Sequence, residues 1–344
     1  MDLLPKRARV CRTHHLTGGE ATCQVVGGSS GQHDTAGQWV YAGGMLEMAF
    51  ACLAGTEAEA RHSLLLAQSL RAFGGSLAGA PVMALYPLGG APPPELEPEM
   101  RAAAITPVPF ALPAPLSDVP LAQRAAGAAQ AEAVAQETAR LLVWLDSDTL
   151  ILREPLGLKI PQGALVGCRP VDLRLIGSAW DEAPDPLWAS IYAGCGVDAE
   201  RIFPVRTTIE GQALRAYFNA GCLVTRPEAR ILRRWLAGIL SLAGRDAFRS
   251  LSGRERLFFH QAVLAGTLLA TLRREEIAIL PATVNYPLHL HDRVPGDRRP
   301  AGLSQIESCR YEGVFDREDW ASRVPVEADL QEWLEARRWL ARNA

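Results

Sequence analysis

The sequence contains no apolar run of the roughly 18 to 20 residues that a membrane-spanning helix requires. Its 344 residues carry a formal net charge of −3, so no excess of positive charge is present to attract nucleic acid. The charged stretch Met1 to Val10 is followed by no apolar core, and we therefore expect no secretory signal. The seven cysteines include no CxxC pair, which predicts reduced thiols in a cytoplasmic protein.

The first part of the chain also lacks apolar periodicity. Residues 1–44 are rich in Gly, Ser, Thr and His, which predicts an irregular N-terminal segment. Four residues there are of types that bind zinc: Cys11, His14, His15 and Cys23. Their spacing matches no closed zinc site, so a solvated tail is the favoured interpretation.

From Met45 onward, apolar runs alternate with helical patterns. We predict strands in 45–53, 81–88, 105–112 and 141–145, helices over 57–73 and 121–140, and a Pro-rich surface loop over 91–100. Buried strands alternating with helices are typical of a mostly parallel sheet covered on both faces. The sequence therefore predicts the α/β class.

The second half of the chain is less regular. We predict strands over 164–170 and 215–227, helices over 228–243, 258–272 and 330–342, and a strand from Glu276 that becomes a loop at Pro287. The expected organisation is an irregular segment over 1–44, one α/β domain over 45–315 and a C-terminal helical extension over 316–344.

Two aspartates, Asp146 and Asp148, follow the apolar run Leu141–Leu145. In an extended chain residues i and i+2 point to the same side, and ligands gather at the carboxyl ends of parallel strands. Carboxylates are ligands for Mg²⁺ or Mn²⁺, whose free positions substrate phosphates commonly fill. The pair therefore predicts a divalent metal that carries a diphosphate, although aspartate pairs also cap helices and shape turns.

Four segments in a fixed order resemble the GT-A fold glycosyltransferases, and within them the glycogenin-like retaining enzymes. They are VWLDSDTLIL (143–152), YFNAGCLVTRP (217–227), FFHQAVLAG (258–266) and ILPATVNYPLHLH (279–291). The resemblance covers roughly residues 45–315 and implies a single Rossmann-like domain. It implies an enzyme that transfers a sugar from a nucleotide-sugar, by default a UDP-sugar, with retention of the anomeric configuration. The acceptor would be a glycan, a lipid, a protein or a small molecule, and the cofactor would be Mn²⁺ or Mg²⁺.

The resemblance also implies roles for residues near the donor. Asp148 would be the principal metal ligand, and Asp146 would reach the metal through water or bind the ribose. Arg124, on the helix before the aspartates, would face the phosphates, for which a guanidinium is well suited. The loop residues Ala54, Gly55 and Thr56 would lie against the base.

Further residues would border the transferred sugar. Asn219 would hydrogen-bond its hydroxyl groups, and Gly221 would permit close approach. Gln261 matches the family's glutamine beside the sugar, whereas His260 stands where the family has an acid, which puts the catalytic details in question.

For the third metal ligand, the resemblance offers two candidate places in the chain. His289 and His291 form one candidate pair, of which His291 is favoured. The segment RYEGVF (310–315) is the other candidate, because relatives can carry HYH there. This chain has Arg310 and Glu312 instead, and Glu312 could coordinate as a carboxylate.

Three alternative interpretations were weighed. A phosphotransferase of the haloacid dehalogenase type would have Thr or Val at the position of Leu150, and its aspartates would lie near the start of the domain. Here the aspartates come about a hundred residues into the domain. A nucleotidyltransferase would need a Gly-rich, basic phosphate loop after the first strand, where CLAGTEAEARHS is a poor match. A non-catalytic protein that binds a nucleotide-sugar or a partner on the same fold is the third, motivated by His260 and Arg310.

Overall fold

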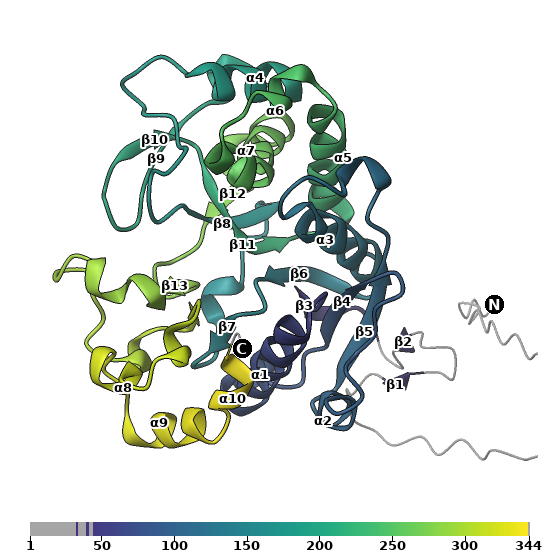
Figure 1. Ribbon diagram of the computed structural model, residues 1–344, viewed down its shortest axis with the longest axis vertical. Coiled ribbons are helices and arrows are strands. Elements are labelled where there is room, and N and C mark those ends of the chain that lie inside the picture. Colours follow the sequence, from purple (N-terminus) through teal and green to yellow (C-terminus); the bar gives the residue numbers. More distant parts are fainter. Residues whose placement is uncertain (1–31, 34–38, 41–43, 343–344) are drawn as a thin grey trace, which may run out of the picture.

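A seven-stranded sheet is the centre of the structure, a computed structural model that describes residues 32–33, 39–40 and 44–342 (Figure 1). Its strands in spatial order are β12 (Ile277–Ile279), β8 (Val166–Pro170), β11 (Phe218–Thr225), β6 (Ala139–Leu145), β3 (Leu46–Leu53), β4 (Val82–Pro87) and β5 (Ile105–Phe110). Strand β11 is antiparallel to β6 and β8, and the other pairings are parallel. The predicted α/β class with a mostly parallel sheet is confirmed.

Both faces of the sheet are buried under apolar layers, because side chains of a strand alternate between its two sides. On β3, Ala51 and Leu53 join one apolar cluster while Phe50 and Cys52 join the other. The first cluster includes α3 (Ala122–Ala135), α4 (Pro186–Cys195), α5 (Ile231–Ala243) and α7 (Gly253–Thr271). The second includes α1 (Glu57–Phe73), α9 (Ala328–Glu335) and α10 (Arg338–Ala341). Helices therefore cover both faces, as predicted.

Helix α1 shows how local sequence sets an element. The Thr56 side chain accepts from the backbone N–H of Glu59, and the Glu59 carboxylate accepts from the backbone N–H of Thr56. This reciprocal capping satisfies two donors that a helix N-terminus otherwise leaves open. The helix spans the predicted range 57–73, and it begins directly after the loop that ends β3.

Three predicted boundaries were wrong. The helix expected to reach Arg140 ends at Ala135, because residues from Ala139 pair with β3 and so begin β6. The Pro-rich loop contains a short helix, α2 (Glu97–Ala102). The expected C-terminal helix is split into α9 and α10.

A small second sheet matters for the site. It has the order β13 (Tyr286–Pro287), β14 (Ser308–Arg310) and β7 (Thr149–Ile151), and β14 runs antiparallel to β7. Arg310 stands opposite Thr149 in this pairing. The last residue of β14 is thereby held beside the aspartate pair, which lies between β6 and β7.

The remaining elements are short or lie at the edge of the fold. They are β1 (Gln32–His33), β2 (Trp39–Val40), β9 (Pro204–Arg206), β10 (Ala213–Arg215), α6 (Asp246–Arg249) and α8 (Trp320–Arg323). Cys11, His14, His15 and Cys23 lie outside the described residues. Within the described chain, no helix has the length and apolar character needed to cross a membrane.

Candidate active site

The aspartate pair occupies a turn between β6 and β7. We expected an extended chain there, but the backbone turns after Leu145 and Asp148 immediately precedes β7. The two carboxylates nevertheless face a common partner: Oδ2 of Asp146 and Oδ2 of Asp148 each lie 3.6 Å from Nε of Arg310. The predicted convergence of the acids is therefore present, although a turn and not a strand produces it.

Asp146 is almost fully enclosed, with a side chain that is 4% exposed. Its Oδ1 lies 2.6 Å from Nη1 of Arg124, and its backbone N–H donates to the carbonyl of Gly221 at 2.8 Å. Its Oδ2 is buried and has no hydrogen-bond partner among the described residues. Burial raises the pKa of Asp146, but Arg124 and Arg310 lower it more, so the carboxyl keeps a pKa below its ordinary value.

Asp148 has a different environment. Burial is the main cause that raises its pKa to about 6, and the charge of Asp146 adds to the rise while Arg310 opposes it. Its backbone carbonyl accepts from the N–H of Tyr311 at 3.0 Å, which ties the turn to the residue after β14. The two acids are thus unequal: Asp146 stays ionised, and Asp148 gains a proton just below neutral pH.

A cavity of about 210 Å³ opens beside the pair. Its lining residues are Leu53, Thr56, Ala58, Glu59, His62, Arg124, Asp146, Ser147 and Asp148. The end of β3, the start of α1 and the helix α3 therefore meet the aspartate turn. Of the predicted donor-site residues, Thr56, Arg124, Asp146 and Asp148 line this one cavity, and Ala54 and Gly55 are the chain neighbours of Thr56.

Gly221 lies against Asp146 in the antiparallel strand β11. A Cβ at this position would be 2.2 Å from Oδ2 of Asp146 and 3.0 Å from Oδ1 of Asn219. No side chain fits there without moving the carboxylate, so the close approach that the sequence predicted for Gly221 is made to Asp146.

The side-chain amides of Asn219, on β11, and Gln261, on α7, are both held by backbone N–H groups of β11. Oδ1 of Asn219 accepts from the N–H of Gly221 at 2.7 Å, and Oε1 of Gln261 accepts from the N–H of Ala220 at 3.1 Å. Both side chains are 8% exposed. Because each amide oxygen is held by the backbone, the NH₂ groups point the other way and are the donors these residues can offer.

His260 neighbours Gln261 on α7 and is buried, with 2% exposure. Its Nδ1 lies 3.1 Å from the carbonyl of Leu257, which is consistent with a proton on Nδ1. Burial, together with the charge of Arg124, lowers the pKa of His260 to about 3, although the Leu257 carbonyl and Asp146 oppose the shift. The imidazole is therefore neutral at physiological pH.

The structure separates the residues considered for the third metal position. Glu312 forms an ion pair with Arg310, and its carboxylate lies 3.1 Å from Nε2 of His289, whose pKa burial lowers. Nδ1 of His291 instead lies 2.9 Å from the hydroxyl of Tyr286. Glu312 and His289 are thus connected to the aspartate pair through Arg310. The favoured candidate, His291, contacts the Tyr286 hydroxyl through its Nδ1 instead.

The predicted divalent metal can be tested against these side chains. Across the described residues, no group of three or more His, Cys, Asp or Glu side chains is arranged to hold a metal ion. Asp146 pairs with Arg124 and Arg310, and Arg310 also lies beside Asp148 and Glu312. Two guanidinium groups therefore already neutralise much of the negative charge that would recruit a dication.

Distance adds a second objection to a metal. A cation bonded to both carboxylates at about 2.1 Å would lie within about 6 Å of Nε of Arg310. Repulsion between a double and a single positive charge at that distance is about 5 kcal/mol at an effective dielectric constant of about 20, so a metal there would favour a displaced Arg310 side chain. As arranged, the residues present do not fit a metal held between Asp146 and Asp148.

Sequence reasoning missed two parts of the site. Arg310 was noted only as a departure from a histidine, and nothing in its local sequence places it between two acids 162 to 164 positions earlier. His62 lines the cavity and is 5% exposed. It falls within the helical pattern of 57–73, where a histidine facing a site cannot be told from one packed in the core.

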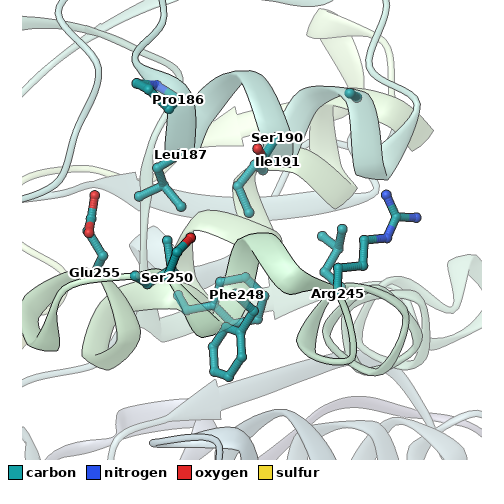
Figure 2. A pocket seen from close by; sticks show the side chains of 12 residues that line it. Pro186, Leu187, Ser190, Ile191, Arg245, Phe248, Ser250 and Glu255 are labelled. Atoms are coloured by element: carbon teal, nitrogen blue, oxygen red, sulfur yellow. The ribbon is translucent and has the colours of Figure 1, made fainter.

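A separate cavity of about 350 Å³ lies among α4, α6 and α7 (Figure 2). Leu187 and Ile191 on α4 face Phe248 and Arg245 across it. It contains none of the predicted site residues, although its lining residue Phe259 directly precedes His260 on α7. The acids, the arginines and the buried amides all belong to the other region, which we take as the active site.

Comparison with solved structures finds glycosyltransferases at low identity. The galactosyltransferase LgtC, in complex with donor and acceptor sugar analogs, is 15% identical, with 86% of this chain and 95% of that chain covered and a TM-score of 0.44. Mouse xyloside xylosyltransferase 1, in its apo form, is 12% identical, with coverages of 77% and 97% and a TM-score of 0.41. Core-mannan synthase A from Aspergillus fumigatus, in an Mn/GDP form, is 10% identical, with coverages of 75% and 79% and a TM-score of 0.43.

No curated protein matches the sequence. A family model does: the Rhodobacterales glycosyltransferase domain matches residues 51–268, which is more than half of the chain and includes the aspartate turn, β11 and most of α7. The glycosyltransferase class predicted from the sequence is thereby confirmed, and the chain belongs to the Rhodobacterales glycosyltransferase domain family.

Proposed function

We propose that this glycosyltransferase takes its sugar from a nucleoside-diphosphate sugar bound in the cavity at the end of β6. The observation that carries the proposal is Asp146, an ionised and buried carboxylate that holds Arg124 at 2.6 Å on the cavity wall. A buried ion pair is costly to maintain for stability alone. Its place at the carboxyl end of a strand, where ligands of such sheets bind, supports a role in binding the donor.

The phosphate end of the donor would lie against Arg124. When the bond between the anomeric carbon and the diphosphate breaks, the leaving group gains negative charge, and a fixed guanidinium stabilises that charge as it develops. Thr56, at the end of the loop Ala54–Thr56, lines the same cavity, which supports the predicted place of the base on that loop. The predicted Mn²⁺ or Mg²⁺ has no part in this proposal, because the acids already have their cations.

The sugar would lie beside β11 and α7. The NH₂ groups of Asn219 and Gln261, whose oxygens are held by backbone N–H groups, would donate to its hydroxyl groups. Neutral His260 cannot act as a general acid near pH 7, because its pKa is about 3. Its role would be to accept a hydrogen bond or to shape the wall.

We further propose that transfer retains the configuration of the anomeric carbon, on the resemblance to retaining enzymes. The anomer of the product, read by proton NMR of the first sugar released or transferred, tests this part separately. An inverted product would contradict retention and leave the proposed donor class intact.

The test of the proposed function is donor hydrolysis across a panel of nucleotide-sugars, beginning with UDP-sugars. The wild type is compared with Arg124→Ala and with the control Arg101→Ala, which removes an arginine whose side chain is 78% exposed and pairs with Glu97. Turnover that is lost in Arg124→Ala and kept in the control supports the proposal. Binding without turnover would support the non-catalytic alternative. If no donor binds or is turned over, the proposed function is refuted.

A further inference from the structure

Arg310 is held beside the aspartate turn by the backbone, not by its side chain alone. Strand β14 pairs with β7, so that Arg310 stands opposite Thr149, and the next N–H, of Tyr311, donates to the carbonyl of Asp148 at 3.0 Å. Two ordered strands therefore fix the base of the side chain. The side chain itself is 22% exposed, so its guanidinium is largely enclosed.

The guanidinium lies between the two acids, yet its Nε–H group forms no hydrogen bond with any described residue. Its Nε is 3.6 Å from Oδ2 of Asp146 and 3.6 Å from Oδ2 of Asp148, which is within ion-pair range but too long for a hydrogen bond. The Nε–H is buried and has no acceptor in the described part of the chain. A buried donor without a partner is costly, so this geometry calls for an oxygen atom that a ligand would supply.

The charge of Arg310 is secure. Burial lowers its pKa, but the surrounding carboxylates of Asp146, Asp148 and Glu312 raise it more, and the net result lies above the ordinary value. The chain thus places a permanent positive charge at the end of β14, next to one of the two places where the third metal ligand was expected.

We propose that the Arg310 guanidinium takes the place of the divalent metal, binds the diphosphate of the donor and makes the transfer independent of Mn²⁺ and Mg²⁺. This rests on the proposed function above. In the step, the bond between the anomeric carbon and a diphosphate oxygen breaks and its electron pair stays on that oxygen. The acceptor oxygen bonds to the anomeric carbon, and its proton passes to the departing phosphate or to water. Arg310 donates to the diphosphate and keeps its own proton throughout.

A substitution of Arg310 by histidine gives a direct test. In Arg310→His, an imidazole joins the two carboxylates, which creates three ligands of the types that hold Mn²⁺. Mn²⁺ alone is titrated into each protein, and the loss of the free-ion signal is followed by electron paramagnetic resonance. The control is Arg317→His, because Arg317 is an arginine 51% exposed that pairs with Asp319 away from the turn.

The expected result is one Mn²⁺ bound per chain in Arg310→His and none in the wild type or in Arg317→His. UDP and GDP binding, measured by calorimetry, should be the same in EDTA and in Mn²⁺ for the wild type. In Arg310→His the affinity should fall at least about tenfold in EDTA and recover with Mn²⁺. Circular dichroism checks that each variant is folded.

Two outcomes would overturn the proposal: one Mn²⁺ bound per wild-type chain, or a wild-type nucleotide affinity that collapses in EDTA. Failure of the proposed function looks different, because no nucleotide would bind any of the proteins in either buffer. The diphosphate role of Arg310 would then fall with it. The Mn²⁺ titration would still decide whether Arg310 excludes a metal from the acids.

Discussion

Replacing Asp148 by asparagine is expected to stabilise the folded protein at about pH 8. Burial raises the pKa of Asp148 from 3.8 to about 6, so the folded state binds this proton more tightly than the unfolded chain does. For an acid with a raised pKa, the unfolding free energy is highest below the unfolded-state value and falls as the pH rises through the folded-state value. The wild type should therefore lose stability between about pH 4 and about pH 7 at this residue.

The size of the effect follows from the shift. One pKa unit corresponds to about 1.4 kcal/mol, so a rise from 3.8 to about 6 corresponds to roughly 3 kcal/mol at neutral pH. The side chain is 18% exposed, so solvent screens it only in part. Asparagine has nearly the same shape and carries no charge, and it removes this loss. The variant should gain between about 1 and 3 kcal/mol over the wild type at about pH 8.

Urea unfolding of both proteins at about pH 4 and about pH 8 measures the difference. The gap should be small at the lower pH, where Asp148 is protonated in the folded state and lies close to its ordinary pKa of 3.8 in the unfolded chain. Asp319→Asn is the control of opposite sign, because hydrogen bonds from Arg317 and Arg323 lower the pKa of Asp319 to about 2. A variant Asp148→Asn that is less stable than the wild type at the higher pH, or a gap that does not change with pH, would refute the reasoning.

Three further predictions concern the surroundings of the site. Gly221→Ala places a Cβ 2.2 Å from Oδ2 of Asp146, so the carboxylate must move, and donor hydrolysis should fall on the order of 100-fold; unchanged turnover would contradict the proposed place of the donor. The ring of His260, with a pKa of about 3, should show no titration by NMR between about pH 5 and about pH 8; a midpoint in that range would show that the ring is not enclosed as described. Glu132 is 0% exposed, and its carboxylate accepts from the backbone N–H and from Nε of Arg233, each at 3.0 Å. Glu132→Ala should therefore lower the unfolding free energy, measured in urea, by about 3 to 5 kcal/mol. A loss below about 1 kcal/mol would show that this buried link between α3 and α5 is dispensable.

Local sequence predicted the central elements well, because their signals are local. Apart from Glu47, the run 45–53 is apolar on both faces of a strand, and the structure buries both faces of β3 from Met48 onward. The Thr56 and Glu59 side chains that cap α1 lie within one turn of its start. Boundaries were less secure where a partner strand decided them, as at Ala139, whose pairing with Leu46 ends the helical prediction early.

The site was predictable only in part. Asp146 and Asp148 could be recognised from the apolar strand before them, whereas Arg124 was assigned only through the resemblance to the glycogenin-like enzymes. The assignments to donor, sugar and metal stay predictions that the experiments above test. His291 could not be separated from His289 by sequence, because the contact of its Nδ1 with the Tyr286 hydroxyl depends on how residues 286–291 coil.

The amino-acid sequence by itself determined the α/β class, the order of the main strands and helices, and a pair of carboxylates at the end of a buried strand. These follow from hydrophobic periodicity and capping, which act over a few residues. Only the tertiary structure decided what neutralises the carboxylates. The pairing of β14 with β7 brings Arg310 next to residues far earlier in the chain, and no local pattern encodes a contact made across two sheets.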